Sequence, residues 1–258
     1  MAEFKSHESY RRFAESVATK WRYARNAEQT EFLQTVFATS ASRQEVLHSG
    51  MILWRAQRDH SWRADPTDGG DLEEYPCAVR PERMKPKVNR ASEGRANPRG
   101  IPYLYLATEE DTAIAEVRPW IGSYVSVAQF ALRRELRVVN CVSDYRSTII
   151  WCQQEPAPEV REQSVWRDID QAFSQPVTLA DDIAEYAPSQ ILAEFFREKG
   201  LDGVAYGSSL GDGHSVALFD PGVAKVLNGR LVRISKVKLW YSDEDNPYFV
   251  DEEQDPVL

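Results

Sequence analysis

The most informative stretch of the chain reads Gly94-Arg-Ala-Asn-Pro-Arg-Gly-Ile-Pro-Tyr-Leu-Tyr-Leu-Ala-Thr108, and Ala113-Ile-Ala-Glu-Val117 follows it closely. Its glycines and prolines predict a turn. The apolar residues 102–107 predict a short strand. Thr108, with Asp111 three residues further on, predicts the cap of a short helix. We therefore expect a turn, a strand and a helix to lie next to one another here.

Three side chains in this stretch suit one ligand. Arg95, Tyr105 and Glu116 are ten and then eleven positions apart. A guanidinium binds phosphate oxygens, an aromatic ring stacks on a cationic ring, and a carboxylate stabilises a ribosyl cation. NAD+ is one ligand that combines the matching groups. Each residue also has an ordinary explanation: a surface arginine, a core tyrosine, and a solvated glutamate paired with Arg118 or with a lysine elsewhere in the chain.

Two other segments supply candidate ligand groups. Arg55 lies between Trp54 and Ala56 on a predicted strand, where it either binds phosphate or faces solvent. The loop 207–213 offers hydroxyl and backbone N–H groups that suit a phosphate or a carboxamide, although a plain hairpin loop explains it equally well. His214 beside Ser215 forms no catalytic triad without an acid and an oxyanion hole. The four histidines show no metal-ligand spacing, so we expect no metal.

The first 50 residues predict helices. An apolar face at helical spacing runs along the first of them. Asn26 with Gln29 predicts a capping box that opens a second helix, and Ser42 with Glu45 predicts a third, short one. Helices are followed mostly by strands, which favours the α+β class. Beyond residue 50 we expect strands at 51–56, 124–132, 136–142, 203–206, 215–219 and 231–238, helices at 158–174 and 189–199, and an irregular connection over 57–100.

Composition indicates a normal globular protein. The 258 residues are 42% hydrophobic and 28% charged, and the net charge of −9 argues against direct nucleic-acid binding. Residues 80–99 nevertheless hold seven basic and two acidic side chains, whereas the chain after Tyr241 holds seven acidic ones and no basic one.

The cysteines and the apolar runs bear on location. Cys77, Cys141 and Cys152 form no disulfide framework, which suits a reducing cytoplasm. The N-terminus has no apolar segment of the signal-peptide kind, and no run is long enough to span a bilayer. We therefore expect a cytoplasmic protein that does not contact membranes.

The chain resembles the RES-domain family, named for arginine, glutamate and serine. The family's Gly-Arg-aromatic-Asn-Pro-x-Gly-x-Pro-x-Leu-Tyr-Leu-Ala pattern is matched by residues 94–107, and its Thr-Ala-x-Ala-Glu pattern by residues 112–116. Further matches are a Tyr-x-x-x-Gln helix at 186–190 and an Asp-Gly-x-x-Tyr-x-Ser-Ser element at 202–209. The resemblance covers roughly residues 51–225.

The resemblance implies a fold and a function. It implies an ADP-ribosyltransferase-like split β-sheet and a toxin of the toxin–antitoxin type that degrades NAD+ by hydrolysis or phosphorolysis, with an Xre-type antitoxin as partner. Some relatives instead transfer ADP-ribose to proteins, and a non-catalytic nucleotide- or partner-binding module is a further alternative. By match, Glu116 and Arg95 are the catalytic residues, and Tyr105, Ser208, Ser209 and Arg55 bind NAD+.

Two features depart from the family pattern. Ala96 stands where the family has a bulky aromatic residue, which would loosen one pocket wall. Residues 1–50 have no counterpart in the minimal pattern and form an added helical element. We therefore expect a helical extension at 1–50, a RES domain at 51–240 and an acidic tail at 241–258.

Overall fold

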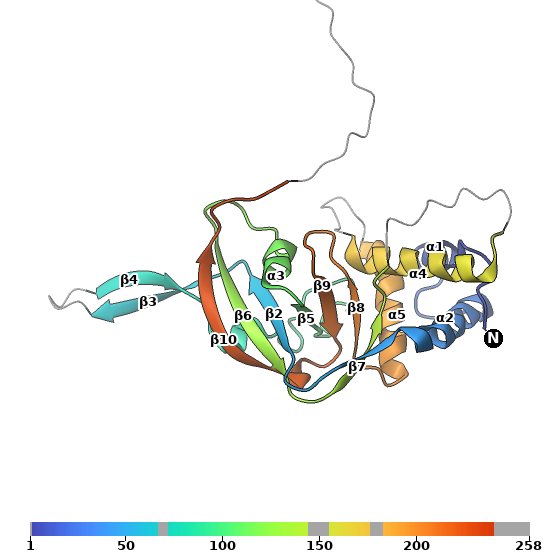
Figure 1. The fold of residues 1–258 in the computed structure, drawn as a ribbon, viewed down its shortest axis with the longest axis horizontal. Coiled ribbons are helices and arrows are strands. Elements are labelled where there is room, and N and C mark those ends of the chain that lie inside the picture. Colours follow the sequence, from blue (N-terminus) through green and yellow to red (C-terminus); the bar gives the residue numbers. More distant parts are fainter. Residues whose placement is uncertain (1, 67–71, 144–154, 176–182, 240–258) are drawn as a thin grey trace, which may run out of the picture.

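The chain folds into a mixed β-sheet with a layer of helices packed at one end of it (Figure 1). The structure, a computed structural model, describes residues 2–66, 72–143, 155–175 and 183–239. The predicted acidic tail and Cys152 lie outside these residues. The α+β class with an N-terminal helical extension is confirmed. Within the described residues, no helix combines the length and apolarity that crossing a membrane requires.

Eight strands form the main sheet in the order β1-β7-β8-β9-β5-β2-β6-β10. β7 and β8 pair in parallel, and the other neighbours pair antiparallel. The strands are β1 Gln44–Leu47, β2 Ile52–Gln57, β5 Leu104–Ala107, β6 Tyr124–Leu132, β7 Leu136–Asn140, β8 Gly203–Gly207, β9 His214–Leu218 and β10 Ala224–Arg233.

The sheet nearly divides between β5 and β2. These strands are joined through a single residue pair, Trp54 with Ala107. By contrast, β2 pairs with β6 along Ile52–Gln57, and β5 pairs with β9 along Leu104–Ala107. Two halves of the sheet therefore separate at this position. The short helix α3, Glu110–Glu116, packs against β2 and β5 beside the gap.

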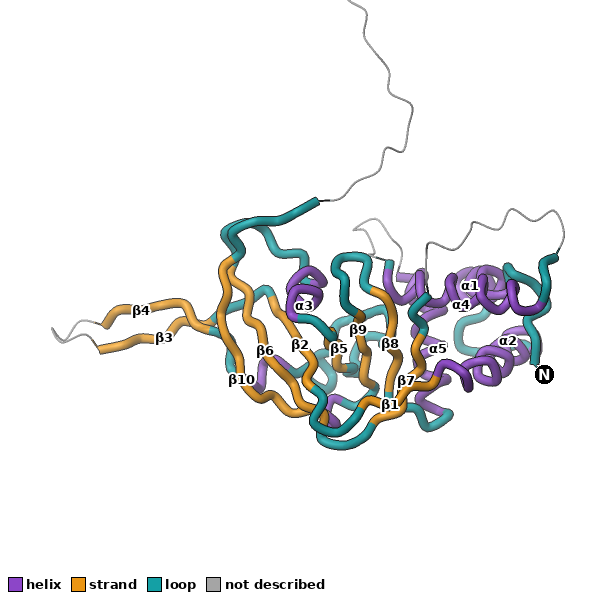
Figure 2. Tube along the Cα trace, in the orientation of Figure 1, coloured by secondary structure: helices purple, strands orange, loops and turns teal. Residues whose placement is uncertain are grey.

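Four helices cover the β7–β8 end of the sheet (Figure 2). Their shared core contains Trp166, Phe173 and Phe196, all fully buried. Two of the helices belong to the N-terminal extension, so this extension shares the core of the domain. The helices are α1 Ser9–Thr19, α2 Ala27–Thr39, α4 Pro158–Ser174 and α5 Ala187–Glu198, and the short 3-10 turns are η1 Ser40–Arg43, η2 Pro81–Met84, η3 Ile183–Tyr186 and η4 Pro221–Val223.

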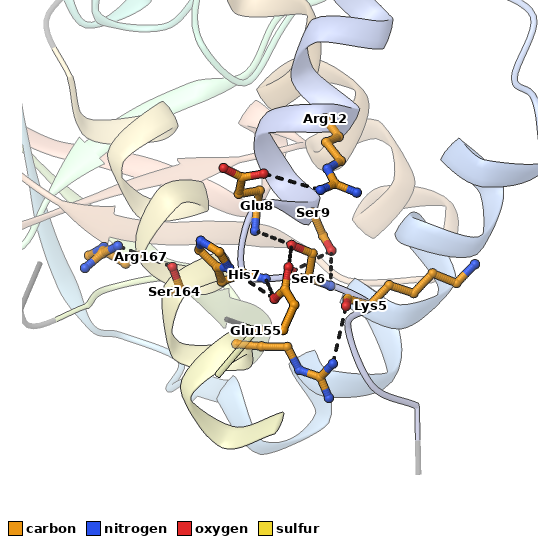
Figure 3. Close-up of polar contacts among 10 residues, drawn as sticks. Lys5, Ser6, His7, Glu8, Ser9, Arg12, Glu155, Ser164 and Arg167 are labelled. Atoms are coloured by element: carbon orange, nitrogen blue, oxygen red, sulfur yellow. Dashed lines mark hydrogen bonds and ion pairs between the residues drawn. The ribbon is translucent and has the colours of Figure 1, made fainter. Parts of the chain in front are cut away.

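The segment before α1 is fastened to the chain just before α4 (Figure 3). Glu155 accepts hydrogen bonds from the Ser6 hydroxyl at 2.5 Å and from the His7 backbone N–H at 3.2 Å. The hydrogen bond from Ser6, followed by those with the His7 ring (Nδ1 at 3.1 Å) and the His7 backbone, holds the pKa of the Glu155 carboxyl down at about 2. Further along α4, Arg161 donates to the Lys5 carbonyl at 3.3 Å. The N-terminal segment therefore fixes the start of α4.

Several predicted elements are confirmed. The capping box of α2 is present, since Asn26 Oδ1 accepts from the Gln29 N–H at 2.8 Å and Gln29 Oε1 accepts from the Asn26 N–H at 3.1 Å. The helix over 158–174 has the predicted bounds. Gly200 follows α5 with a φ of +80°, the left-handed conformation that favours glycine.

Other predictions were wrong. The third helix expected from Ser42 does not form, because residues 44–47 pair with β7 as the edge strand β1. The connection over 57–100 is not irregular throughout, since it contains a hairpin of β3 Ser61–Pro66 and β4 Leu72–Cys77 that projects from the sheet (Figure 1). Thr108 does not cap α3 but accepts a hydrogen bond from His214 N–H. The last strand ends at Arg233, five residues before the predicted end.

Candidate active site

A cavity of about 220 Å³ lies where the two halves of the sheet separate, between β2, β5 and α3. Three of the six predicted site residues line it: Arg55, Tyr105 and Glu116. The motif residues on a strand and a helix are therefore brought together with an arginine from 50 positions earlier in the chain. The remaining lining residues are Trp54, Ala56, Leu106, Ala107, Ala113, Val117, Tyr206 and Ser215.

Glu116 is held by two hydroxyl groups. It is the last residue of α3, and its Oε1 accepts a hydrogen bond from Ser208 Oγ at 2.7 Å and from Ser215 Oγ at 3.4 Å. Among the ion pairs of the described residues, none joins Glu116 to Arg118. The two hydroxyl groups thus orient a half-buried carboxylate that lines the cavity.

Arg55 is half-buried in the cavity wall. Its Nη1 donates to the Tyr105 carbonyl at 2.9 Å, and its buried Nε has no hydrogen-bond partner in the described part of the chain. Burial lowers the pKa of the guanidinium. An unpaired buried donor costs roughly 1–3 kcal/mol, and a ligand that supplies an acceptor offsets this. Arg55 is therefore suited to bind an oxygen atom of a ligand in the cavity.

Tyr105 connects the cavity to the turn over residues 94–101 (the motif turn). Its hydroxyl donates to Asn97 Oδ1 at 2.6 Å and accepts from the Ala96 N–H at 3.0 Å. Burial raises the pKa of this hydroxyl. A Cβ added at Gly94 would lie 2.6 Å from the Tyr105 oxygen, so this position requires glycine. The ring lines the cavity while the hydroxyl holds the turn.

Arg95 does not line the cavity. Its Nη1 donates to the carbonyl of Phe173 at 2.7 Å, and its own carbonyl accepts from Ser189 Oγ at 2.6 Å. Its positive charge opposes the burial that raises the pKa of Tyr105. Arg95 therefore lies behind the Tyr105 side of the cavity.

The two predicted serines have different surroundings. Ser208 contacts Glu116 directly. Ser209 Oγ instead donates to the Ser174 carbonyl at 2.9 Å, at the end of α4. Neither residue is among those that line the cavity. Ser208 is thus one contact away from the cavity, and Ser209 fastens the loop that carries it.

Of the eight lining residues that the sequence did not single out as site residues, three are aromatic or carry a hydroxyl: Trp54, Tyr206 and Ser215. Tyr206 is the tyrosine of the element at 202–209, so the motif contained the signal. Burial raises the pKa of its hydroxyl. Ser215 has no sequence signal beyond its place on a strand. The expectation that Ala96 loosens a pocket wall was wrong, because Ala96 is fully buried in the helical core and does not line the cavity.

The arrangement of these side chains defines a class of binding site. A fixed carboxylate, a buried guanidinium and aromatic walls suit a ligand that has oxygen acceptors and carries or develops positive charge. Within the described residues, no group of three or more histidine, cysteine or acidic side chains lies close enough to hold a metal ion.

Comparison with known proteins gives the family. The family model described as "RES domain" matches residues 52–236, and the chain therefore belongs to the RES-domain family. One solved structure that is similar to this chain is the crystal structure of the M. tuberculosis MbcT–MbcA toxin–antitoxin complex. The match covers 77% of this chain and 91% of the chain in that structure, with 15% sequence identity and a TM-score of 0.38. No curated protein matches the chain.

Proposed function

We propose that this protein is a toxin-like enzyme that cleaves the nicotinamide–ribose bond of NAD+. The observation that carries the proposal is the placement of Glu116 in the cavity, fixed by Ser208 Oγ at 2.7 Å and facing the same space as Arg55 and Tyr105. Membership of the RES-domain family supports it.

Cleavage develops positive charge on the ribose, and Glu116 stabilises it. The bond between C1′ of ribose and N1 of nicotinamide breaks, and its electron pair neutralises the pyridinium nitrogen. An oxygen of water or of inorganic phosphate then bonds to C1′ and releases a proton to solvent. The products are nicotinamide and ADP-ribose, or its 1-phosphate. A fixed carboxylate beside the developing cation lowers the barrier because it needs no reorganisation.

The other residues bind the substrate in this proposal. The cavity is smaller than the roughly 300–1,000 Å³ of typical small-molecule sites, so it suits the nicotinamide–ribose part of NAD+. The Tyr105 ring packs against nicotinamide, and Arg55 offers its unpaired Nε to an oxygen acceptor. A guanidinium has five N–H donors, so Arg95 retains donors for the pyrophosphate while Nη1 holds Phe173. Ser209 keeps the Ser208 loop in place.

One experiment separates the alternatives. The pure protein is incubated with NAD+, with and without phosphate, and nicotinamide and the ribose-containing product are followed by mass spectrometry. Free ADP-ribose indicates hydrolysis, ADP-ribose 1-phosphate indicates phosphorolysis, and a mass gain on protein indicates ADP-ribosyl transfer. The absence of nicotinamide release, or release undiminished in Glu116→Gln, would contradict the proposal and favour a non-catalytic binding module.

The cellular part of the proposal concerns location and partner. We propose action on the NAD+ of the cytoplasm and neutralisation by a cognate antitoxin of the Xre type. Expression of the wild-type chain in a host cell should lower cellular NAD+ and arrest growth, whereas Glu116→Gln should do neither. Growth arrest at unchanged NAD+ would refute the link.

A further inference from the structure

The last turn of α4 contacts several parts of the candidate site at once. The Phe173 carbonyl accepts from Arg95, and the Ser174 carbonyl accepts from Ser209. The Phe173 ring stacks on the ring of Tyr206, with centroids 5.6 Å apart. This turn of α4, residues 170–174, therefore contacts the motif turn, a cavity wall and the loop over residues 208–213 (the serine loop), and holds the three together.

Asp170 contributes the buried charge of this turn. Its side chain is fully buried. Oδ1 accepts from the Gly207 N–H at 2.8 Å, and Oδ2 accepts from the Ser143 N–H at 2.8 Å. A carboxylate with this degree of burial is strongly unfavourable unless it is paired by hydrogen bonds. Asp170 is therefore tied to the end of β8, where the serine loop begins.

The contact to Gly207 reaches the proposed catalytic carboxylate in two steps. Gly207 is followed directly by Ser208, and Ser208 Oγ donates to Glu116 Oε1 at 2.7 Å. The path from Asp170 to Glu116 thus consists of one hydrogen bond, one peptide unit and a second hydrogen bond. Since Oγ lies three bonds from the peptide nitrogen of Ser208, a shift of the Gly207 backbone moves the Ser208 hydroxyl with it.

We propose that Asp170 is a positioning residue for the Ser208–Glu116 pair. It acts through the backbone of Gly207 and touches neither substrate nor the reacting atoms. The kinetic test of this role measures nicotinamide release and therefore rests on the proposed NAD+ cleavage. Since a misplacement of about 1 Å can reduce a rate by about 100-fold, the position of Ser208 is expected to affect turnover more than substrate binding.

Asp168 provides a matched control. It lies on the same helix, is also buried, and pairs with Arg11 at 3.2 Å, away from the serine loop. Asp170→Ala is expected to lower kcat for nicotinamide release by about 10- to 100-fold with KM changed less than about threefold. Asp170→Asn, which keeps one carbonyl oxygen for Gly207, should recover part of the rate. Asp168→Ala should keep the wild-type kcat in the folded protein.

A double-mutant cycle tests the route through Ser208. If Asp170 acts through this hydroxyl, Asp170→Ala should change kcat little once Ser208→Ala is present. Losses that multiply would overturn the proposal, as would an equal loss of kcat in Asp168→Ala. If Asp170→Ala does not fold, Asp170→Asn is placed in the same cycle.

Hydrogen exchange supplies a readout that does not depend on catalysis. Asp170→Ala should speed amide exchange across residues 206–212, and Asp168→Ala should not. A wild-type protein that releases no nicotinamide would refute the proposed function, while the exchange result would still decide whether Asp170 holds the serine loop. Unchanged exchange in Asp170→Ala would overturn the positioning role even in an active enzyme.

Discussion

The two ends of α4 are held in different ways. At its start, the N-terminal segment binds through groups that are partly exposed, with Glu155 44% exposed and Glu3 54% exposed. At its end, a fully buried carboxylate and two carbonyl groups hold the candidate site. Exposed charge pairs contribute little stability, whereas buried hydrogen bonds become costly when one partner is removed. We therefore expect the two ends to respond differently to substitution.

The largest effect should come from Glu116, on the site side of this comparison. Glu116→Gln keeps the shape of the side chain but removes the charge that stabilises the ribosyl cation. Loss of one such charged group is expected to lower nicotinamide release by roughly 100- to 1,000-fold. Product formation is measured by mass spectrometry under single-turnover conditions, together with the thermal midpoint, which should stay within a few degrees.

Asp111→Asn is the matched control for that substitution. Asp111 lies on the same short helix and is exposed, so its variant should retain wild-type turnover. Equal losses in the two variants would assign the effect to α3 as a structural unit rather than to the Glu116 charge.

Arg55 should show the next largest effect. Arg55→Lys removes the buried Nε and replaces the planar guanidinium with a point charge. A hydrogen bond to a charged group contributes about 1.5–3 kcal/mol, so the KM for NAD+ should rise by about 10- to 100-fold with a smaller change in kcat. Steady-state kinetics tests this, with the exposed Arg58→Lys as control. An unchanged KM would remove Arg55 from the binding site.

Tyr105→Phe should act mainly on stability. The variant leaves Asn97 Oδ1 and the Ala96 N–H without their shared hydroxyl partner. Each unsatisfied buried group costs about 1–3 kcal/mol, so urea unfolding should show a loss of about 2–6 kcal/mol for the two groups. Since the ring remains in the cavity wall, kcat should fall less than in Glu116→Gln. A larger fall in kcat with unchanged stability would assign the hydroxyl itself to catalysis.

The difference between the two ends of α4 also explains what sequence could predict. The sequence could predict that Tyr105 and Glu116 lie near one another, because they lie on a strand and on the helix that follows it, and these two elements pack together. The contacts at the end of α4 were not predictable in the same way, because two of them are backbone carbonyls of Phe173 and Ser174, and any residue type supplies a carbonyl. Strand β1 was missed because its sequence, Gln44-Glu-Val-Leu47, is short and half polar, and its pairing with β7 decides its conformation.

The smallest effect should come from Glu155, at the opposite end of α4. Hydrogen bonds from Ser6 and His7 hold its pKa at about 2, below the roughly 4.3 of an unfolded glutamate. The folded protein therefore binds this proton less readily than the unfolded chain, so the stabilisation is present above about pH 4 and is lost as the pH falls toward 2. Because the side chain is nearly half exposed, solvent screening keeps the effect small. Glu155→Gln should lower the urea midpoint slightly at pH 7, and the difference should shrink as the pH falls from about 4 toward 2, with the exposed Glu159→Gln as control. Turnover at pH 7 should not change.

A loss of turnover in Glu155→Gln at unchanged stability would contradict this expectation. It would show that the N-terminal segment acts on the site through α4, and the two ends of the helix would then form one functional unit.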